Sequence, residues 1–163
     1  MEIRKTRPTD NFNAIASIYA LSWKSAYKGI VQQQYLDKLS ETRWSEKLPN
    51  SPWDSFVLIE DGVYIGTSSI GPARDEAMDG WGEIISIYLL PEYLGKCYGK
   101  PLLDMVISEL VIMGYHRIYL WVLEDNLRAR AFYEKNGFAP TSDKMTIEIG
   151  GEDLIEMRYI YCI

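Results

Sequence analysis

The amino-acid sequence predicts a single mixed α/β domain over residues 1–163, with a mostly antiparallel sheet of six or seven strands and helices on both faces. The length suits one domain, because a chain of this size buries about 70% of the surface that it exposes when unfolded. A strand-helix-strand order in the middle of the chain indicates one parallel pair of strands. Hairpin signals on either side indicate that the other strands are antiparallel.

The first elements are predicted to be a strand and a helix. Residues 2–6 are compatible with a short strand. Thr9 or Asp10 is placed to cap a helix that ends near Gly29. Apolar and aromatic residues recur in this helix at helical spacing, namely Phe12, Ile15, Ile18, Tyr19 and Trp23.

The next segment contains a weaker helix and a strong hairpin signal. A helical pattern covers roughly residues 32–48, and the sequence PNSP at 49–52 ends it. Two β-rich runs then flank Asp61 and Gly62, a pair that favours a tight turn because glycine readily adopts positive φ. The polar residues 73–80 are expected to form a loop.

The middle of the chain contains the strand-helix-strand unit. Residues 81–90 predict a strand that is apolar on both faces, as expected near the centre of a sheet. A helix follows over about 98–113 and stops at Gly114, and residues 116–123 predict the second strand. One apolar stripe of the helix consists of Leu102, Leu103, Val106, Ile107, Leu110 and Val111.

The C-terminal part is predicted to form a short helix and a hairpin. Asn126 is suited to cap the helix, and Gly137 is suited to follow its end. Two strands lie on either side of Gly150 and Gly151. The free edge of this hairpin is able to pair with a second copy of the sheet, so the sequence leaves a homodimer open.

Composition and charge exclude several classes of function. The 17 basic and 23 acidic residues give a formal net charge of −6, the wrong sign for binding nucleic-acid phosphates or an anionic membrane. Two cysteines and one histidine are too few for a Cys/His zinc site. Neither a signal peptide nor a spanning segment is visible. We therefore expect a cytoplasmic protein that binds no metal, no nucleic acid and no membrane.

The sequence YLGKCYGKPLLDMVI, residues 93–107, places a loop with two glycines directly before a helix. Backbone N–H groups at the start of a helix have no partner within it, and with the helix dipole they bind phosphate. The available donors are the amides of residues 95–100, with the ammonium groups of Lys96 and Lys100 nearby. A simple strand-to-helix turn has the same pattern, so the loop alone leaves both interpretations open.

Two longer stretches resemble the Gcn5-related N-acetyltransferase (GNAT) family. The sequence GEIISIYLLPEYLGKCYGKPLLDMVI, residues 82–107, looks like the acetyl-CoA motif of that family. Residues 118–138 look like the motif that follows, including the pattern N-x-x-A-x-x-F-Y-x-x-x-G-F from Asn126 to Phe138. The resemblance implies an acetyl-CoA-dependent N-acetyltransferase whose parallel strands are splayed apart to open a cleft.

The resemblance also implies which residues contact acetyl-CoA. The backbone of Ile87 and Leu89 would pair with the pantetheine arm. The family's pyrophosphate signature, Arg/Gln-x-x-Gly-x-Gly/Ala, aligns with Leu94, Cys97 and Gly99, so only the last glycine is kept and weaker affinity is expected. The implied contact residues are Ile87, Tyr88, Leu89, Leu94, Gly95, Lys96, Cys97, Tyr98, Gly99, Lys100, Asn126, Ala129 and Phe132.

Acetyl transfer to an amine requires a neutral nucleophile, stabilisation of the oxyanion and a proton for the departing thiolate. By resemblance, Tyr133 supplies that proton, because a phenol with a pKa of about 10 stays protonated at neutral pH. Glu83 matches a family carboxylate that removes the amine proton through water. Each residue also has a purely structural explanation. Tyr133 would belong to the apolar face of its helix, Glu83 would be an exposed residue at a strand end that aids solubility, and Asn126 would cap its helix.

The acceptor is less clearly defined by the sequence. Trp23 and Tyr27 lie in a region that closes over the acceptor in the family, and aromatic side chains there are able to bind a cationic amine. The expected reaction is direct attack by a primary amine of a small molecule or peptide in a ternary complex. The alternative is a family member that binds CoA with little or no transferase activity. A dinucleotide-binding enzyme is disfavoured, because Tyr119 stands where such an enzyme needs an acidic residue.

Overall fold

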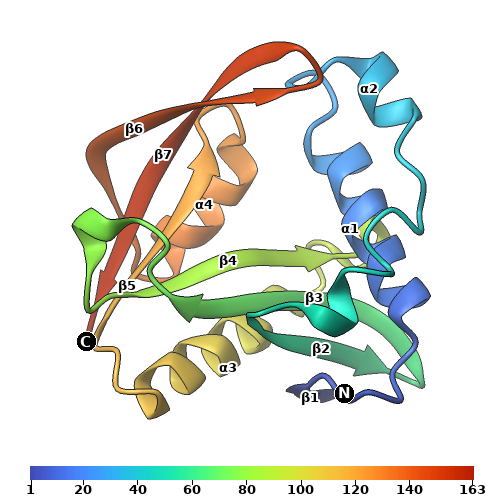
Figure 1. Cartoon of the computed structure of the whole chain (residues 1–163), viewed down its shortest axis with the longest axis horizontal. Coiled ribbons are helices and arrows are strands. Elements are labelled where there is room, and N and C mark those ends of the chain that lie inside the picture. Colours follow the sequence, from blue (N-terminus) through green and yellow to red (C-terminus); the bar gives the residue numbers. More distant parts are fainter.

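A seven-stranded sheet in the spatial order β1-β2-β3-β4-β5-β7-β6 organises the chain (Figure 1). The computed structural model describes all 163 residues. Every neighbouring pair of strands is antiparallel except β4 and β5, which confirms the mixed sheet and its one parallel pair. The strands are β1 (Glu2–Lys5), β2 (Asp54–Glu60), β3 (Val63–Pro72), β4 (Gly82–Leu89), β5 (Arg117–Leu123), β6 (Ala139–Ile149) and β7 (Glu152–Cys162).

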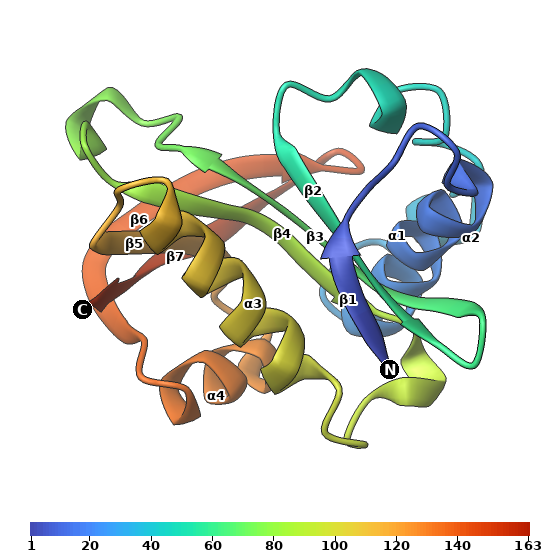
Figure 2. The ribbon, with the colours of Figure 1, turned by 90° about the horizontal axis from the view of Figure 1, so that it is seen from below.

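The helices cover both faces of this sheet, as the sequence predicts (Figure 2). One face carries α1 and α2, and the other carries α3 and α4. The helices are α1 (Phe12–Ala26), α2 (Gln33–Asp37), α3 (Gly99–Ile112) and α4 (Leu127–Lys135), with short 3₁₀ turns η1 (Leu48–Asn50), η2 (Glu76–Met78) and η3 (Pro91–Tyr93). None of the helices combines the length and the apolar character needed to cross a membrane.

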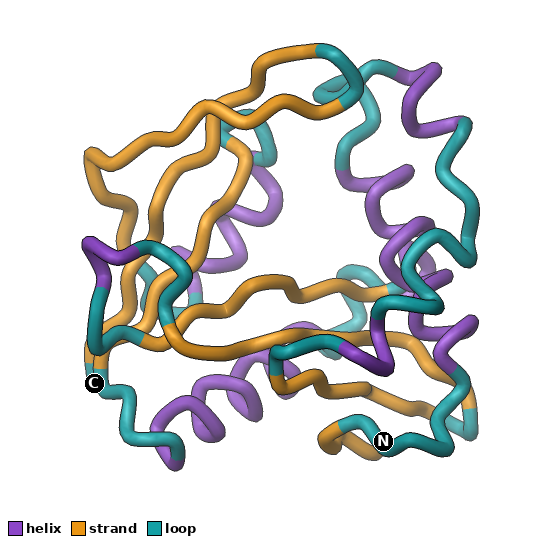
Figure 3. The backbone as a smooth tube through the Cα atoms, in the orientation of Figure 1, coloured by secondary structure: helices purple, strands orange, loops and turns teal.

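The parallel strands β4 and β5 pair only where both begin. Gly82 lies opposite Ile118 and Glu83 opposite Tyr119, and no further pair joins the two strands. Beyond this point β4 continues beside β3, whereas β5 continues beside β7 (Figure 3). The sheet therefore separates into two halves, which confirms the splayed strand pair.

A β-bulge in β4 controls which side chains point to each face. Ser69 of β3 pairs with Ser86 and Ile70 pairs with Ile84, so Ile85 is an extra residue on β4. After the bulge, Ile87 packs against the core between the sheet and α3. Ser86 points to the other face, where its hydroxyl lies 3.2 Å from that of Tyr19 in α1.

The largest core cluster lies between the sheet, α3 and α4. The α3 stripe buries Leu102, Leu103, Val106 and Leu110, whereas Ile107 and Val111 are only partly buried. A separate small cluster joins Val31, Leu36 and Leu39 to Ile149 and Leu154 at the tip of the C-terminal hairpin. This contact holds the hairpin tip against α1 and α2, so residues from both ends of the chain enclose the same region.

The start of α1 differs from the sequence prediction. Asn11, rather than Thr9 or Asp10, caps the helix and accepts a hydrogen bond of 3.1 Å from the amide of Ala14. The carboxylate of Asp10 instead accepts a hydrogen bond of 2.6 Å from the guanidinium of Arg4. Competition from this ion pair explains the one-residue shift, which a local capping pattern does not reveal. The helix also ends at Ala26, short of Gly29.

The helix predicted over 32–48 is wrong for most of its length. Only Gln33–Asp37 form α2, and turns occupy most of the residues from there to η1. The hydroxyl of Ser40 accepts a hydrogen bond of 3.3 Å from the amide of Thr42, a local bond that competes with helical pairing.

The other predicted elements are confirmed with small shifts of their ends. Asp61 (φ 49°) and Gly62 (φ 78°) form the tight turn between β2 and β3. The side chain of Asn126 caps α4, and Gly137 follows it with a φ of 91°. The predicted C-terminal hairpin turns at Gly150 and Gly151, both of which have positive φ.

Candidate active site

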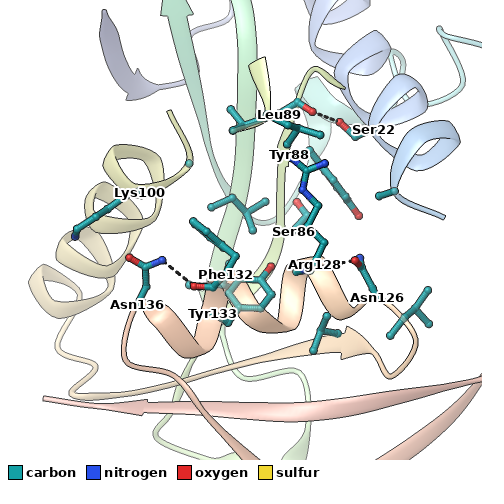
Figure 4. Close-up of a pocket in the computed structure, with 18 of the residues that line it drawn as sticks. Ser22, Ser86, Tyr88, Leu89, Lys100, Asn126, Arg128, Phe132, Tyr133 and Asn136 are labelled. Carbon is teal, nitrogen blue, oxygen red and sulfur yellow. Dashed lines mark hydrogen bonds between the residues drawn. The ribbon is translucent and has the colours of Figure 1, made fainter. Parts of the chain in front are cut away.

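A cavity of about 840 Å³ lies where β4 and β5 diverge (Figure 4). The C-terminal half of α1 and the end of β4 form one wall, and α4 and the end of β5 form the opposite wall. The loop at 94–99 and the first turn of α3 contribute further lining residues, and β7 contributes Glu156.

Most of the predicted site residues line this cavity, although the sequence separates them by up to about a hundred positions. Four do not: Trp23, Glu83, Lys96 and Tyr98 are absent from the lining. The predicted residues that line the cavity are Tyr27, Ile87, Tyr88, Leu89, Leu94, Gly95, Cys97, Gly99, Lys100, Asn126, Ala129, Phe132 and Tyr133.

Three of the four residues outside the cavity interact elsewhere. The ammonium of Lys96 lies 5.5 Å from the ring centroid of Tyr93. The hydroxyl of Tyr98 is 3.4 Å from the carboxylate of Glu60. The indole of Trp23 donates a hydrogen bond of 3.1 Å to the hydroxyl of Tyr88, so Trp23 supports a cavity residue without lining the cavity itself.

Glu83 is buried and fully occupied by hydrogen bonds. Its side chain is 1% exposed and forms an ion pair of 2.6 Å with the guanidinium of Arg74. The same carboxylate accepts a hydrogen bond of 3.0 Å from the backbone amide of Arg74 and one of 2.8 Å from the hydroxyl of Tyr119. The sequence analysis missed Arg74, which lies in the polar loop before β4. A carboxylate held by this many donors is poorly placed to remove a proton from a substrate.

The N-terminus of α3 has unpaired backbone donors at the edge of the cavity. Asparagine side chains cap α1 and α4, but no side chain caps α3. A Cβ atom at Gly99 would lie 3.2 Å from the ring of Phe132, so glycine allows this turn to approach α4 closely. Free amides at a helix start suit a phosphate, and the site therefore fits the pyrophosphate of acetyl-CoA.

The loop before α3 has two residues in the left-handed region. Gly95 has a φ of 76° and Cys97 a φ of 66°. Cys97 stands where the family signature has glycine, and the structure shows that this position adopts a positive φ. A non-glycine residue in this conformation costs about 1–2 kcal/mol, so the loop keeps its shape against local strain.

Basic side chains also line the cavity, although the protein is acidic overall. Lys100 forms an ion pair of 2.6 Å with Asp104 one turn later. Arg128 and Lys135 line the same cavity from α4 and take part in no ion pair. Figure 4 shows Arg128 extending from α4 toward β4. The lining therefore includes two cations that no carboxylate of the chain neutralises.

Tyr133 combines a buried ring with an unpaired hydroxyl. The ring packs against Phe132 and Phe138, with centroids 5.6 and 5.8 Å away. Its hydroxyl forms no hydrogen bond within the chain and is turned toward β4 in Figure 4. Burial raises the pKa of Tyr133, with a smaller contribution from Tyr88, so the phenol keeps its proton at neutral pH.

Hydroxyl groups connect α1 to the end of β4. The Ser22 hydroxyl donates a hydrogen bond of 2.6 Å to the carbonyl of Leu89. Burial raises the pKa of Tyr27 to about 12 and that of Tyr88 well above its ordinary value. Both phenols are therefore neutral, and this wall of the cavity is polar without being charged.

A second hollow of about 280 Å³ lies beside the main cavity. Ile85 and Ser86 line both, so the bulged part of β4 separates them. Tyr19, Lys47 and Trp53 are among the other lining residues. The arrangement gives β4 one hollow toward α1 and the η1 turn, in addition to the larger cavity toward α4.

The sequence analysis missed Arg128, Lys135, Asn136 and Glu156 as cavity residues. A signal existed for Arg128, Lys135 and Asn136, because helical spacing places them on the same side of α4 as the predicted residues Ala129 and Phe132. No local signal marks Glu156. It reaches the cavity only because β7 pairs with β5, in a contact between distant parts of the sequence.

Comparison with known proteins agrees with this geometry. The model of the acetyltransferase (GNAT) family matches residues 14–138. The spermidine N(1)-acetyltransferase of Thermoplasma acidophilum is 28% identical over 163 residues, with 98% of each chain covered. The L-amino acid N-acyltransferase MnaT of Escherichia coli is 30% identical over 146 residues, which cover 87% of this chain and 81% of the relative.

Solved structures show the same fold. The PaiA N-acetyltransferase from Thermoplasma acidophilum, crystallised in complex with coenzyme A, superposes with a TM-score of 0.75 at 25% identity, covering 99% of this chain and 98% of that chain. A ribosomal-protein-alanine N-acetyltransferase from Brucella melitensis has a TM-score of 0.75 at 19% identity over the whole of both chains. The chain therefore belongs to the acetyltransferase (GNAT) family and is an acyltransferase that depends on acetyl-CoA.

Proposed function

We propose that this protein transfers the acetyl group of acetyl-CoA to a primary amine of a small molecule or peptide, by direct attack in a ternary complex. One observation carries the proposal: a single cavity contains the uncapped start of α3, the diverging end of β4 and the free hydroxyl of Tyr133. These are the parts needed to bind a phosphate, align an acyl group and protonate a leaving thiolate.

The proposed tasks are divided among different elements. The amides at the start of α3, together with Arg128 and Lys135, bind the phosphates. The backbone of residues 86–89 aligns the pantetheine arm, and the bound acetyl-CoA supplies an activated thioester. Tyr133 donates a proton to the departing sulfur. Glu83 as general base remains a prediction that its bonds to Arg74 and Tyr119 do not favour.

The acceptor is proposed to be a cationic amine that has no carboxylate beside it. Glu156 lines the cavity from β7, and none of α1, β5 and β7 contributes a basic residue to the lining. A free amino acid would place its carboxylate near Glu156, and the cation that acts on Glu156, Arg74, is already paired with Glu83. The whole-length relative named for spermidine fits this pattern better than the relative named for L-amino acids.

The proposal is tested by measuring free thiol released from acetyl-CoA in the presence of single amines. A suitable panel is spermidine, 1,4-diaminobutane, alanine and a short peptide with a free N-terminus, with the acetylated product identified by mass spectrometry. We expect turnover with the first two amines to exceed that with alanine. Faster reaction with alanine would contradict the proposed acceptor class.

The same assay separates an enzyme from a protein that only binds CoA. A ligand that binds the folded state raises its melting temperature. A rise with acetyl-CoA and CoA, combined with no amine-dependent thiol release for any amine, would favour the binding protein. If neither compound raised the melting temperature, both the enzyme and the CoA-binding protein would be contradicted.

A further inference from the structure

We infer that Glu156 receives the ammonium group of the acceptor and takes up its proton, so that a neutral amine attacks the acetyl group. The inference rests on the proposed transfer to an amine and goes beyond it by assigning the general base. It also replaces the carboxylate that the sequence favours, Glu83, with one from a different strand.

The sheet register places Glu156 on the acceptor side of the cavity. Glu156 lies opposite Leu123 at the end of β5, which is itself a lining residue. Its neighbour Met157 faces the core beside α4, as does Tyr159. Because side chains alternate along a strand, Glu156 faces the opposite way, toward α1.

Glu156 is the cavity carboxylate without a partner. Two carboxylates line the cavity, and the other one, Asp104, is paired with Lys100 at 2.6 Å. No hydrogen bond or ion pair involves the side chain of Glu156, which is half-buried. An unpaired carboxylate that is partly removed from water favours a cation as its ligand, and an ammonium group supplies one.

The surroundings of Glu156 also suit proton uptake. Burial raises the pKa of its carboxyl, Arg74 lowers that pKa and Glu83 raises it. The phenol of Tyr27 faces the same space from α1 and is neutral. A carboxylate with a raised pKa is a stronger base than one in water, and it still loses its proton more readily than an alkylammonium does.

The chemistry balances with the groups present. An alkylammonium loses two protons when it becomes an amide. Glu156 takes the first and passes it to solvent, and the amine nitrogen then forms its bond to the acetyl carbon. As the carbon–sulfur bond breaks, Tyr133 protonates the sulfur, and the second amine proton restores the Tyr133 hydroxyl through solvent. The products are the acetamide and free CoA thiol.

The test compares Glu156→Gln with Glu152→Gln in the full chain. Glu152 is an exposed carboxylate on the same strand and lies outside the cavity, so it controls for the loss of one charge. With spermidine or 1,4-diaminobutane as acceptor, Glu156→Gln is expected to lower kcat by about 10²-fold or more. Affinity for acetyl-CoA and the melting temperature are expected to stay close to wild type.

The pH profile distinguishes a base from a residue that only shapes the site. Wild-type kcat/KM is expected to fall at acid pH as Glu156 becomes protonated. In Glu156→Gln the limb set by the carboxyl should disappear. The kcat/KM of this variant should instead rise with pH up to the pKa of the substrate ammonium, because only the amine that is already neutral in solution can then react. Glu156→Asp, which keeps a carboxylate, should restore part of the activity and the acid limb.

The possible results separate this inference from the proposed function. Wild-type turnover with an unchanged kcat in Glu156→Gln overturns the inference and leaves the function standing. A rise in the KM for the amine with kcat unchanged also overturns it, because Glu156 would then bind the acceptor without taking its proton. Absence of amine-dependent thiol release by the wild type overturns both.

Discussion

At the scale of single residues, Tyr133 has a free hydroxyl in a buried setting. Its ring packs in the main core cluster, yet its hydroxyl forms no bond within the chain. Because Tyr133 lines the cavity and its hydroxyl is not sealed in the core, the hydroxyl is accessible to a ligand bound there. This supports the proposed role of Tyr133 as the acid.

Replacing Tyr133 with Phe tests that role with little structural disturbance. We expect kcat for amine acetylation to fall by about 10²-fold, because a proton donor to the thiolate is lost. The acetyl-CoA dissociation constant and the melting temperature should change little, since the ring keeps its packing. A variant with wild-type kcat would remove Tyr133 from the mechanism.

Cys97 is a second residue whose conformation has consequences. Its positive φ of 66° is unfavourable for any side chain with a Cβ atom. Cys97→Gly is expected to raise the free energy of unfolding by about 1 kcal/mol, or the melting temperature by about 2–4 °C. Thermal unfolding measures this. Cys97→Ala is the matched control and should stay near wild type, because alanine keeps the strain.

Affinity for acetyl-CoA is expected to change little in Cys97→Gly. The strain belongs to the left-handed conformation of the folded loop, so it cancels in the dissociation constant if the loop keeps that conformation on binding. A Cys97→Gly variant that binds acetyl-CoA much more tightly would show instead that Cys97 disturbs the bound loop.

At the scale of elements, α3 and α4 form the two sides of the proposed phosphate site. The start of α3 supplies amides that no side chain caps, and α4 supplies Arg128 and Lys135, which have no ion-pair partner. Gly99 lets the two helices approach, since a Cβ atom there would meet the ring of Phe132. The site therefore depends on how the helices pack and less on any one signature residue.

Removing the Arg128 cation tests the contribution of α4. Arg128→Ala is expected to weaken acetyl-CoA binding by about fivefold, equivalent to about 1 kcal/mol, because the cation proposed to bind a phosphate is lost. The effect should shrink as salt is added. Titration calorimetry at two salt concentrations measures both. Lys38→Ala, an exposed lysine outside the cavity, is the charge-matched control and should leave binding unchanged.

At the scale of the whole molecule, contacts between distant segments hold the cavity walls together. The C-terminal hairpin packs on α2 through Ile149 and Leu154, and it also carries Glu156 to the cavity. At the other end of the molecule, Asp10 joins the start of α1 to Arg4 on β1 and Tyr64 on β3. A homodimer through the free edge of β6 remains a prediction that light scattering tests.

The Asp10 contacts predict how stability depends on pH. Arg4 lowers the pKa of Asp10 below that of a free carboxyl, with further contributions from Arg7 and Tyr64. Because the pKa of Asp10 is lower in the folded state, its charge contributes fully to the free energy of unfolding above the pKa of the unfolded chain, about 4. This contribution is lost progressively as the pH falls from there toward the lower pKa of the folded state. Asp10→Asn should cost about 2 kcal/mol at neutral pH.

Urea unfolding at pH 7 and pH 3 measures this dependence. The difference in stability between wild type and Asp10→Asn is expected to shrink at the lower pH, because the Asp10 carboxyl of the unfolded chain becomes protonated there while that of the folded chain stays ionised. Asp37→Asn is the control, since Asp37 is exposed and forms no ion pair. An Asp10→Asn effect of the same size at both pH values would contradict the role of its charge.

The sequence by itself determined the order and type of most elements, because local signals specify them. The apolar stripe of α3, the Asn126 cap and the Asp61–Gly62 turn each lie within a few residues and were predicted correctly. It also identified 13 of the 28 residues that line the cavity, since the motifs that resemble the GNAT family lie on neighbouring elements of the middle of the chain. Local hydrogen bonds around Ser40 explain the one helix that was mostly wrong.

Only the tertiary structure decided which of these two carboxylates, Glu83 or Glu156, lines the cavity. Glu83 lies within a recognisable motif, but Arg74 and Tyr119 reach it from other elements and bury it as an ion pair. Glu156 belongs to no motif, and the pairing of β7 with β5 brings it to the cavity. Both outcomes depend on long-range pairing and desolvation, which are properties of the assembled sheet and leave no local pattern in the sequence.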